Sequence, residues 1–263
     1  MRIATWNINS VRARAERALA LLQRADLDVL ALQETKCKDE QFPREMFEEA
    51  GYEVATFGFS QWNGVALISR VGLEKVQYGF PGQPGFGEPE AQVEARAIGG
   101  KCGGVEVWSL YVPHGRALDN PHFVYKLNWL EQLRAHVAFT LHQNPDAQVL
   151  LGGDWNVAPQ DDDVWDLAPF ADGTHISPAE RSAFAAFAKA GLTEVSRQFL
   201  PAPHTYTYWD YQQLRFPKNQ GMRIDFTYTS PALTQRVTGV EIDRDERKGK
   251  GASDHVPVIV TLD

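Results

Sequence analysis

Side chains that could perform acid–base or metal chemistry stand where the apolar segments of this chain stop or restart. They are Asn7, Glu34, Tyr111, Asp154, Asn156, Asp225, Asp254 and His255. A rigid sheet fixes side chains at its strand ends, and the loops that follow leave space for a ligand. We therefore expect these residues to gather at one site.

The local sequence around two of the carboxylates strengthens this expectation. Asp154 and Asn156 are two positions apart, so in an extended chain they point to the same side. Gly152 and Gly153 precede them and allow another backbone or a ligand to come close. Asp225 stands between two apolar residues and, if it is buried, needs a partner. Each residue alone could be a turn residue or a solvated strand end, but together they indicate a site.

The chemistry of this set favours phosphoester hydrolysis. Carboxylate and amide oxygens suit Mg²⁺ or Mn²⁺ better than zinc or copper. Groups that do not hold the metal could position an attacking water and neutralise phosphoryl charge. The chain has no glycine-rich loop of the P-loop or Rossmann type, so the use of nucleoside triphosphates is not indicated. The residues alone predict metal-dependent hydrolysis of a phosphoester.

Hydrophobic spacing predicts the elements that would position these residues. Apolar segments typical of strands occupy residues 3–8, 28–32, 64–68, 105–111, 148–152, 224–228 and 256–262. Helical spacing occurs at 15–22, with Asn9 and Ser10 as the expected cap, at 123–141 and at 184–188. Strands outnumber helices, and the connections are too uneven for a regular βαβ array. We therefore expect an α/β fold with two packed sheets and helices outside them.

Composition and charge limit the class of protein. The 263 residues are 43% hydrophobic and 23% charged, with a formal net charge of −8, which is ordinary for a globular protein and excludes a disordered or collagen-like chain. The segment from Gly79 to Pro89 is rich in glycine and proline and predicts a loop. A linker between two domains is the alternative, but the informative polar residues lie on both sides of it. We therefore expect one catalytic domain over residues 1–263.

Cysteine usage and the start of the chain bear on location. Cys37 and Cys102 cannot form a disulfide framework and lack metal-ligand spacing, which fits a reducing compartment. The N-terminus enters a strand pattern at once, so we expect no signal peptide. No apolar run approaches the roughly 18 residues of a membrane span. The expected location is the cytoplasm, without membrane association.

Six short motifs carry a resemblance to a known family. They are Thr5-Trp6-Asn7-Ile8-Asn9, Leu32-Gln33-Glu34-Thr35-Lys36, Tyr111-Val112-Pro113, Gly152-Gly153-Asp154-Trp155-Asn156, Gly221-Met222-Arg223-Ile224-Asp225 and Ser253-Asp254-His255. In this order they resemble the exonuclease III family, the bacterial apurinic/apyrimidinic (AP) endonucleases of the endonuclease/exonuclease/phosphatase superfamily. The resemblance runs from about residue 2 to 262. The segment from Thr205 to Tyr211 narrows it to the DNA repair branch.

The resemblance implies a fold, an activity and a partner. The fold would be a four-layer α/β sandwich of the DNase I-like kind, with two mixed sheets flanked by helices. The activity would be cleavage of the phosphodiester 5′ to an abasic site in duplex DNA, leaving a 3′-hydroxyl, with 3′→5′ exonuclease and 3′-phosphatase or phosphodiesterase activities. The partner would be double-stranded DNA with abasic or 3′-blocked sites, and the protein would act as a monomer. The ranking of these activities stays open.

The resemblance also implies roles for the site residues. The Mg²⁺ ligands, with Mn²⁺ as a substitute, would come from Asn7, Glu34, Asp154, Asn156, Asp254 and His255. The catalytic groups would be Tyr111, Asp154, Asn156, Asp225 and His255, with Asp225 orienting the His255 ring. Whether Asp154 or His255 is the general base is open within the family, and we favour Asp154. Whether one or two metal ions bind is also open.

The same correspondence predicts a DNA-binding surface. Its residues would be Arg12, Lys36, Arg116, Tyr208, Trp209, Met222, Arg223 and Ile224, of which Tyr208, Met222 and Ile224 would line the pocket for a base-free sugar. Two segments, 211–223 and 247–253, each contain three basic residues and no acid, and each directly precedes a catalytic motif. Positive charge therefore clusters at the expected site, as binding to phosphates requires. His114 stands where the family usually has an amide, which leaves its phosphate contact open.

Two other functions are compatible with parts of this sequence. A phosphodiesterase of the same superfamily acting on inositol phosphates, sphingomyelin or generic DNA would keep the catalytic residues Glu34, Asp154, Asn156 and His255. It gives no reason for the segment around Tyr208 or for the short basic loops. A catalytically dead DNA-binding relative should have lost an acid or imidazole position, and all are present. The repair nuclease remains the favoured function.

Overall fold

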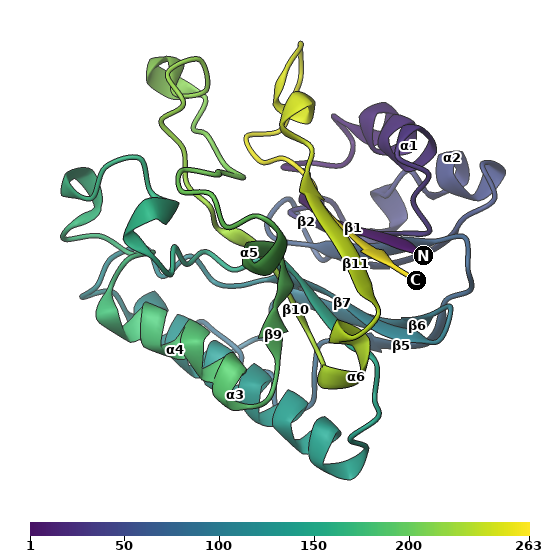
Figure 1. Cartoon of the computed structure of the whole chain (residues 1–263), viewed down its shortest axis with the longest axis horizontal. Helices are drawn as coiled ribbons and strands as arrows, with labels where there is room; N and C mark the ends of the chain where they lie inside the picture. Colours follow the sequence, from purple (N-terminus) through teal and green to yellow (C-terminus); the bar gives the residue numbers. More distant parts are fainter.

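Two six-stranded sheets pack face to face in a computed structural model that describes all 263 residues (Figure 1). In the first sheet the strand order is β11 (Val237–Ile242), β12 (Val258–Leu262), β1 (Arg2–Asn7), β2 (Val29–Gln33), β4 (Val65–Ser69) and β3 (Glu53–Phe57). In the second sheet it is β5 (Glu74–Tyr78), β6 (Ala97–Cys102), β7 (Val105–Tyr111), β8 (Val149–Asp154), β10 (Asp225–Thr229) and β9 (Thr193–Glu194). Each sheet is mixed, because β1 pairs with β2 and β7 with β8 in parallel while the other pairs are antiparallel.

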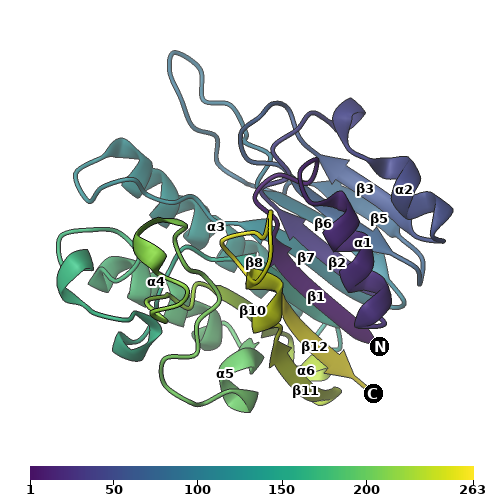
Figure 2. The ribbon, with the colours of Figure 1, turned by 90° about the horizontal axis from the view of Figure 1, so that it is seen from above.

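Helices cover the two outer faces of the sheets, which gives the expected four layers. The helices are α1 (Ala15–Arg24), α2 (Arg44–Glu49), α3 (Pro121–Gln143), α4 (Pro178–Lys189), α5 (Val195–Phe199) and α6 (Pro231–Thr234). The first two lie over the first sheet, and α3 and α4 lie over the second, on the opposite side of the molecule (Figures 1 and 2). Short 3₁₀ turns occupy Asp39–Gln41, Asp161–Asp163, Ala168–Phe170, Gln212–Leu214 and Arg244–Arg247. None of the helices combines the length and apolar character needed to cross a bilayer.

Three apolar layers hold the sheets and helices together. In β1, Ala4 and Trp6 face α1, while Ile3 faces the interior between the sheets. The central layer joins residues such as Val29 and Leu67 of the first sheet to Val107 of the second. Central strands are thus buried on both faces, which explains why they read as continuous apolar runs rather than alternating patterns.

Parallel pairing places the ends of four central strands at one edge of the molecule. Asn7 ends β1 opposite Gln33 of β2, and Tyr111 ends β7 opposite Asp154 of β8. Asp225 opens the antiparallel strand β10 and also pairs with Asp154. The register of the two sheets therefore assembles the predicted chemical residues before any loop contributes.

Glycine is required where β8 approaches its neighbours. A side chain at Gly153 would place its Cβ 2.0 Å from the carbonyl oxygen of Leu110 in β7, and one at Gly152 would crowd Thr5 at 3.2 Å. The pair of glycines before Asp154 therefore allows close packing of β8 against β7 and β1, which fixes the position of the Asp154 carboxylate.

One predicted helix cap and one predicted strand boundary are wrong. The first helix begins at Ala15, because Asn9 and Ser10 adopt positive φ angles (45° and 84°) and the Asn9 side chain donates to Asp254 rather than capping the helix. The last strand begins at Val258 rather than at residue 256, because His255 and Val256 pair with the segment at Thr207 and Tyr208. The glycine- and proline-rich segment from Gly79 joins β5 to β6, which pair in the same sheet, so it is a loop within that sheet and no linker between sheets.

Candidate active site

A cavity of about 470 Å³ opens at the edge where the strand ends meet. Its polar floor contains Glu34, Asp154 and His255, and its apolar wall contains Tyr208, Met222 and Ile224. Tyr111, Asn156 and Asp254 also border it. The structure thus brings the predicted chemical residues and the predicted pocket residues to one place.

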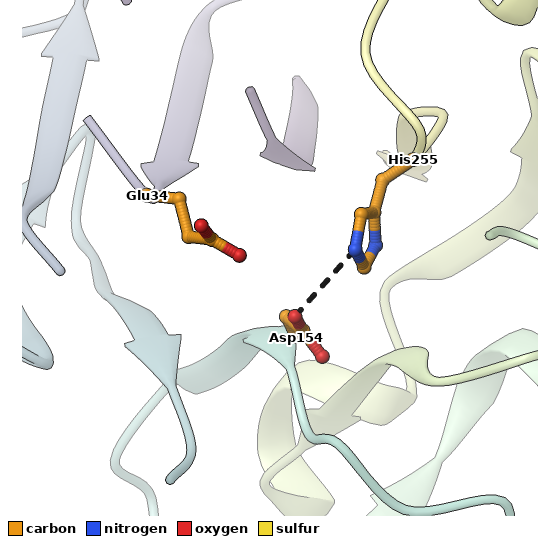
Figure 3. Close-up of side chains that lie close together, drawn as sticks. All are labelled: Glu34, Asp154 and His255. Atoms are coloured by element: carbon orange, nitrogen blue, oxygen red, sulfur yellow. Dashed lines mark ion pairs between the residues drawn. The ribbon is translucent and has the colours of Figure 1, made fainter. Parts of the chain in front are cut away.

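Three side chains form the centre of the floor. Glu34, Asp154 and His255 point toward one another, and one potential ligand atom from each lies within 4.8 Å of the other two (Figure 3). Asn7 lies beneath them and donates through Nδ2 to Glu34 Oε1 (2.8 Å) and to Asp154 Oδ2 (3.0 Å). One amide of β1 therefore fixes both carboxylates.

Asp154 is a carboxylate with an unusual proton affinity. Its burial raises its pKa above the ordinary value, and the nearby Asp225 carboxylate acts in the same direction. His255 and the hydrogen bonds from Asn7 and the Asn156 backbone oppose this rise without cancelling it. Because its pKa is raised, Asp154 is better able than an ordinary aspartate to accept a proton.

His255 is held by a second buried carboxylate. Its Nδ1 lies 2.9 Å from Asp225 Oδ2, while its Nε2 faces the cavity at 3.8 Å from Asp154 Oδ2 (Figure 3). Burial alone would lower the pKa of this ring, but Asp225 and Asp154 outweigh it and raise the pKa above the usual histidine value. The result is an imidazolium with a fixed orientation and one N–H directed into the site.

Glu34, the third member of this cluster, stays ionised. Burial opposes its charge, but the Lys36 ammonium (2.5 Å) and the Asn7 amide lower its pKa. Glu34 and Lys36 both have positive φ angles of 52°, so the backbone after β2 is strained where it presents these two side chains. Strain of this kind persists only where the surroundings impose the conformation, and it clusters at functional sites.

Tyr111 keeps its hydroxyl proton. Burial and the neighbouring Glu34 carboxylate raise its pKa well above the usual value, although Arg96, whose guanidinium lies 4.9 Å from the ring centre, acts in the opposite direction. A phenol that remains protonated next to a phosphate-sized cavity is a hydrogen-bond donor.

Asn156 is fixed on three sides. Its backbone N–H donates to Asp154 Oδ1 (2.9 Å), its Nδ2 donates to the Val112 carbonyl (2.9 Å), and its Oδ1 lies 3.2 Å from His175 Nε2. The residue has a positive φ of 49°. One N–H of its side-chain amide has no protein partner among these contacts and remains available to a ligand.

His175 is a site residue that the sequence did not indicate. It packs edge-to-face on His114, with 4.7 Å between the ring centres, and both rings border the cavity. Burial and the nearby Lys126 charge lower the pKa of both rings, most strongly for His175. Only its position after a turn-rich segment, two residues before the cap of α4, could have drawn attention to it, and that signal is not specific.

Two predicted DNA contacts are contradicted by burial. Trp209 and Arg223 are each only 1% exposed. Trp209 packs edge-to-face on Phe216, and Arg223 donates to the Leu200 carbonyl inside the fold. Both follow or precede a pocket residue in the sequence, so alternation along the chain turns them inward while Tyr208 and Met222 face the cavity. Arg12 and Arg116 are exposed and Lys36 is half-buried, as a surface contact requires.

The basic loops near the site use several of their arginines internally. Arg244 lies over Trp209 and Phe216, and Arg247 lies over Tyr211 and Phe216, at 4.4 to 5.4 Å from the ring centres. These contacts connect the loops at 209–220 and 244–250, which project together from the site end of the molecule (Figure 1). Part of the positive charge found in the sequence therefore stabilises the loops.

The donor set fits a divalent cation that prefers oxygen. Glu34 and Asp154 supply carboxylate oxygens, and the carboxylate of Asp254 borders the same cavity. Such ligands suit Mg²⁺ or Mn²⁺. Nε2 of His255 completes this cluster, while its Nδ1 lies 2.9 Å from Asp225 Oδ2. Asn7, expected as a ligand, presents its Nδ2 to the carboxylates of Glu34 and Asp154 while its Oδ1 accepts the backbone N–H of Asn9, so it offers no oxygen to a metal here.

Comparison with known proteins gives a consistent result. The chain matches the Endonuclease/Exonuclease/phosphatase family over residues 4–255. A protein named exodeoxyribonuclease from Bacillus subtilis (strain 168) is 30% identical over 264 residues, which cover 98% of each chain. Among solved structures, a 3′ phosphatase from Neisseria bound to a product DNA hairpin has a TM-score of 0.93 at 33% identity, covering 100% of this chain and 99% of the other. An AP endonuclease from Archaeoglobus fulgidus has a TM-score of 0.92 at 31% identity, with 100% and 99% coverage.

Proposed function

The chain belongs to the endonuclease/exonuclease/phosphatase family, and from that premise we propose that it is a DNA repair hydrolase acting at abasic sites and at 3′ ends. Its similarity to a 3′ phosphatase, to an AP endonuclease and to an exodeoxyribonuclease supports this range of substrates. The three activities share one chemical step, because each breaks a P–O3′ bond and leaves a 3′-hydroxyl on DNA. One site can therefore serve all three.

The observation that carries the proposal is the cavity with two unlike sides. Its floor contains Glu34, Asp154 and His255 within 4.8 Å of one another, and its wall contains Tyr208, Met222 and Ile224. A charged floor suits a phosphate, and an apolar wall suits a sugar that carries no base. A base-free nucleotide leaves the helical stack at the lowest cost, which favours its entry into such a pocket.

Glu34 would be the principal ligand of the metal ion, which we propose to be Mg²⁺, with Asp254 beside it, and Asp154 would stay free to accept a proton. When bound there, such an ion would act as a Lewis acid that neutralises charge on the phosphoryl oxygens. The Asn7 amide fixes the carboxylates of Glu34 and Asp154 through its hydrogen bonds of 2.8 and 3.0 Å.

Asp154 acts as the general base. Its raised pKa lets it take a proton from the water that attacks phosphorus, and the Asn7 and Asn156 hydrogen bonds hold it in one rotamer. As the new P–O bond forms, the P–O3′ bond breaks and the leaving O3′ oxygen gains a proton to become the 3′-hydroxyl. Positioned acid–base groups of this kind contribute about 10²- to 10⁴-fold in rate.

Three donors stabilise the charge that develops on the phosphoryl group. The His255 imidazolium, oriented by Asp225, directs Nε2–H into the cavity. The Tyr111 hydroxyl and the free N–H of the Asn156 amide border the same space. Donors fixed before the reaction stabilise a transition state without reorganisation cost.

The DNA duplex would lie across the site, with Arg12, Lys36 and Arg116 on its phosphates. These three cations flank the cavity on the loops after β1, β2 and β7, and such contacts position DNA without reading its sequence. We further propose that the protein acts in the cytoplasm as a monomer, since one chain contains every group named in the reaction.

The test is gel analysis of three DNA substrates: a duplex with one tetrahydrofuran abasic analogue, a hairpin with a 3′-phosphate, and a duplex with a recessed 3′-hydroxyl. Each is incubated with Mg²⁺, and again with EDTA. We expect cleavage or phosphate release that leaves a 3′-hydroxyl, and loss of activity in EDTA.

The matched variants are Asp154→Asn and Asp162→Asn. Both replace a carboxylate by its amide, but Asp162 is exposed and is not part of the cluster of Glu34, Asp154 and His255. We expect about a 10²- to 10⁴-fold loss for the first and unchanged activity for the second. If none of the three substrates is cleaved by the wild-type protein, the proposed function is wrong.

A further inference from the structure

A lysine and a glutamate without exposed surface lie behind the cavity wall that carries Asn156. Lys126 on α3 and Glu180 on α4 are each 0% exposed, and Nζ and Oε1 are 2.5 Å apart. No role described above uses either residue. Burying two charges costs desolvation that an apolar pair of similar size avoids, so a buried ion pair is weak evidence for stabilisation. Its contacts indicate what it does instead.

The hydrogen bonds of this pair end on the residues of one cavity wall. Lys126 Nζ donates to the carbonyl oxygen of Asn156 (2.6 Å) and to that of His114 (3.3 Å). Glu180 Oε1 accepts the backbone N–H of His175 (2.9 Å). Its other oxygen, Oε2, accepts from Ser177 at the start of α4, so the glutamate is itself fixed.

Two sets of contacts connect Asn156 to this ion pair. Its backbone has a φ of 49°, a conformation that non-glycine residues adopt at a cost, and the Lys126 bond holds its carbonyl in that conformation. Its side-chain Oδ1 lies 3.2 Å from His175 Nε2, and His175 is held by Glu180. The ion pair therefore controls the peptide of Asn156 directly and its amide through His175.

We propose that Lys126 and Glu180 are positioning residues for the hydrolytic reaction, which hold Asn156 and His175 so that the Asn156 amide faces the phosphate to be cleaved. This inference rests on the proposed phosphoester hydrolysis. Neither residue reaches the cavity, so both act only through the groups that they hold.

The test uses the double variant Lys126→Met/Glu180→Gln. It removes both charges at once and nearly preserves volume, so no uncompensated buried charge remains, and the glutamine keeps an acceptor for the cap of α4. On the DNA substrate that the wild type cleaves best, we expect kcat to fall about tenfold or more while KM changes by less than about threefold, since the lost interaction belongs to the transition state.

Leu133→Ala is the matched control. Leu133 is on the same helix, is also 0% exposed, and packs in the apolar layer over the second sheet rather than behind Asn156. This variant lowers the unfolding temperature through a cavity and should keep kcat within about twofold of the wild type at 25 °C. A fall in kcat equal to that of the double variant would mean that loss of stability alone explains the effect, and would overturn the proposal.

A second comparison asks whether the effect passes through Asn156. In an Asn156→Gly background, where the amide is absent and the positive φ is tolerated, the double change should lower kcat by less than about twofold because coupled residues are not additive. A further tenfold fall there would overturn the proposal, as would an unchanged kcat in the double variant.

One readout does not depend on activity. The side-chain amide resonances of Asn156, assigned by their loss in Asn156→Gly, should shift or broaden in Lys126→Met/Glu180→Gln and stay unchanged in Leu133→Ala. If the wild type cleaves no DNA but these resonances move, the proposed function fails and the positioning role stands. If they do not move, the positioning role is wrong whatever the activity.

Discussion

At the scale of single residues, the site depends on carboxylates whose environments make them unlike one another. Glu34 is held ionised by Lys36 and Asn7, whereas burial raises the pKa of Asp154 toward the range where it can take a proton. In the proposed reaction Asp225 does not contact the substrate. It orients the His255 ring instead. Different roles for neighbouring acids therefore follow from their partners and burial.

Asp225→Asn tests the orienting role of this acid. The amide keeps the shape but removes the charge that favours the imidazolium, so the His255 ring loses its preferred protonation and orientation. We expect kcat to fall about 10- to 100-fold, the usual cost of losing a partner that orients a histidine, as measured by phosphate release from a 3′-phosphorylated hairpin. Activity equal to that of the exposed-site control Asp162→Asn would contradict the role given to Asp225.

His122 gives a pH dependence of stability away from the site. Burial lowers its pKa to about 4, and its Nδ1 accepts the backbone N–H of Gly115 (3.1 Å), which a protonated ring cannot do. An unfolded chain binds this proton near pH 6.5, so protonation favours unfolding. The stabilisation is complete above about pH 6.5 and is lost as the pH falls toward 4.

The check is thermal unfolding followed by circular dichroism at pH 7 and pH 5. The wild-type midpoint should fall between these values by more than that of His122→Gln, which keeps an acceptor but does not titrate. Equal falls for both proteins would show that His122 does not contribute to the acid sensitivity.

At the scale of elements, the place of a strand within its sheet affects whether the sequence predicts it. The apolar run at 105–111 predicts β7 with its observed bounds, and the runs at 148–152 and 224–228 predict β8 and β10 within two residues. The edge strands β3 (EVATF), β5 (EKVQY) and β11 (VTGVEI) and the two-residue β9 are not predicted, because strands at an edge or of two residues lack a long apolar run. The interior strand β6 (AIGGKC) is also not predicted, because two glycines and a lysine interrupt its apolar residues. The residues at central strand ends, which form the site, were therefore the most predictable part.

What the sequence could not indicate are contacts that only the folded chain creates. Lys126 and Glu180 look like ordinary polar positions of amphipathic helices, and nothing local shows that both are buried behind Asn156. The family resemblance predicts Trp209 and Arg223 on the DNA surface, yet both are buried. The position of a segment in the sequence therefore predicts where the candidate site lies. It does not predict which way the side chains of the loops point.

Arg14 holds three loops of the site together and provides a test at this scale. Its guanidinium donates to the carbonyls of Asn9 and Gly251 and to the Tyr211 hydroxyl (3.0 Å). We expect Arg14→Gln to speed hydrogen exchange at residues 249–254 and to lower kcat/KM about tenfold, since Asp254 follows the released loop.

The control for this change is Arg134→Gln, which removes a surface arginine that pairs only with Glu131 on its own helix. It should leave both exchange and activity unchanged. Slow exchange in the Arg14 variant, equal to that of the wild type, would contradict the role of Arg14 in joining the loops.

At the scale of the whole molecule, a net charge of −8 is combined with basic residues on the loops that follow the strands of the candidate site. Arg12 and Arg116 are exposed on two of these loops, whereas several other arginines are used in stacking contacts within the loops at 209–220 and 244–250. The sign of the total charge therefore does not predict the sign of the binding face. Phosphate contacts should make DNA binding depend strongly on salt.

Binding of Asp154→Asn protein to duplex DNA, measured by fluorescence anisotropy over a range of salt concentrations, tests this. Each phosphate contact contributes about 0.9 to the slope of log K against log salt. In that background, Arg12→Ala and Arg116→Ala should each lower the slope by about that amount. Lys75→Ala, an exposed change on β5 away from the cavity, should not. A slope near zero would contradict a phosphate-binding face.

The central claim is that Asp154 directs a water molecule onto a DNA phosphate so that the P–O3′ bond breaks. The most direct measurement is hydrolysis of a 3′-phosphorylated hairpin in ¹⁸O-water, with mass spectrometry of both products, for the wild type and Asp154→Asn. We predict one ¹⁸O atom in the released phosphate, none in the DNA 3′-hydroxyl, and release slowed about 10²-fold or more in the variant. Label in the DNA, or equal release by the two proteins, would contradict the account.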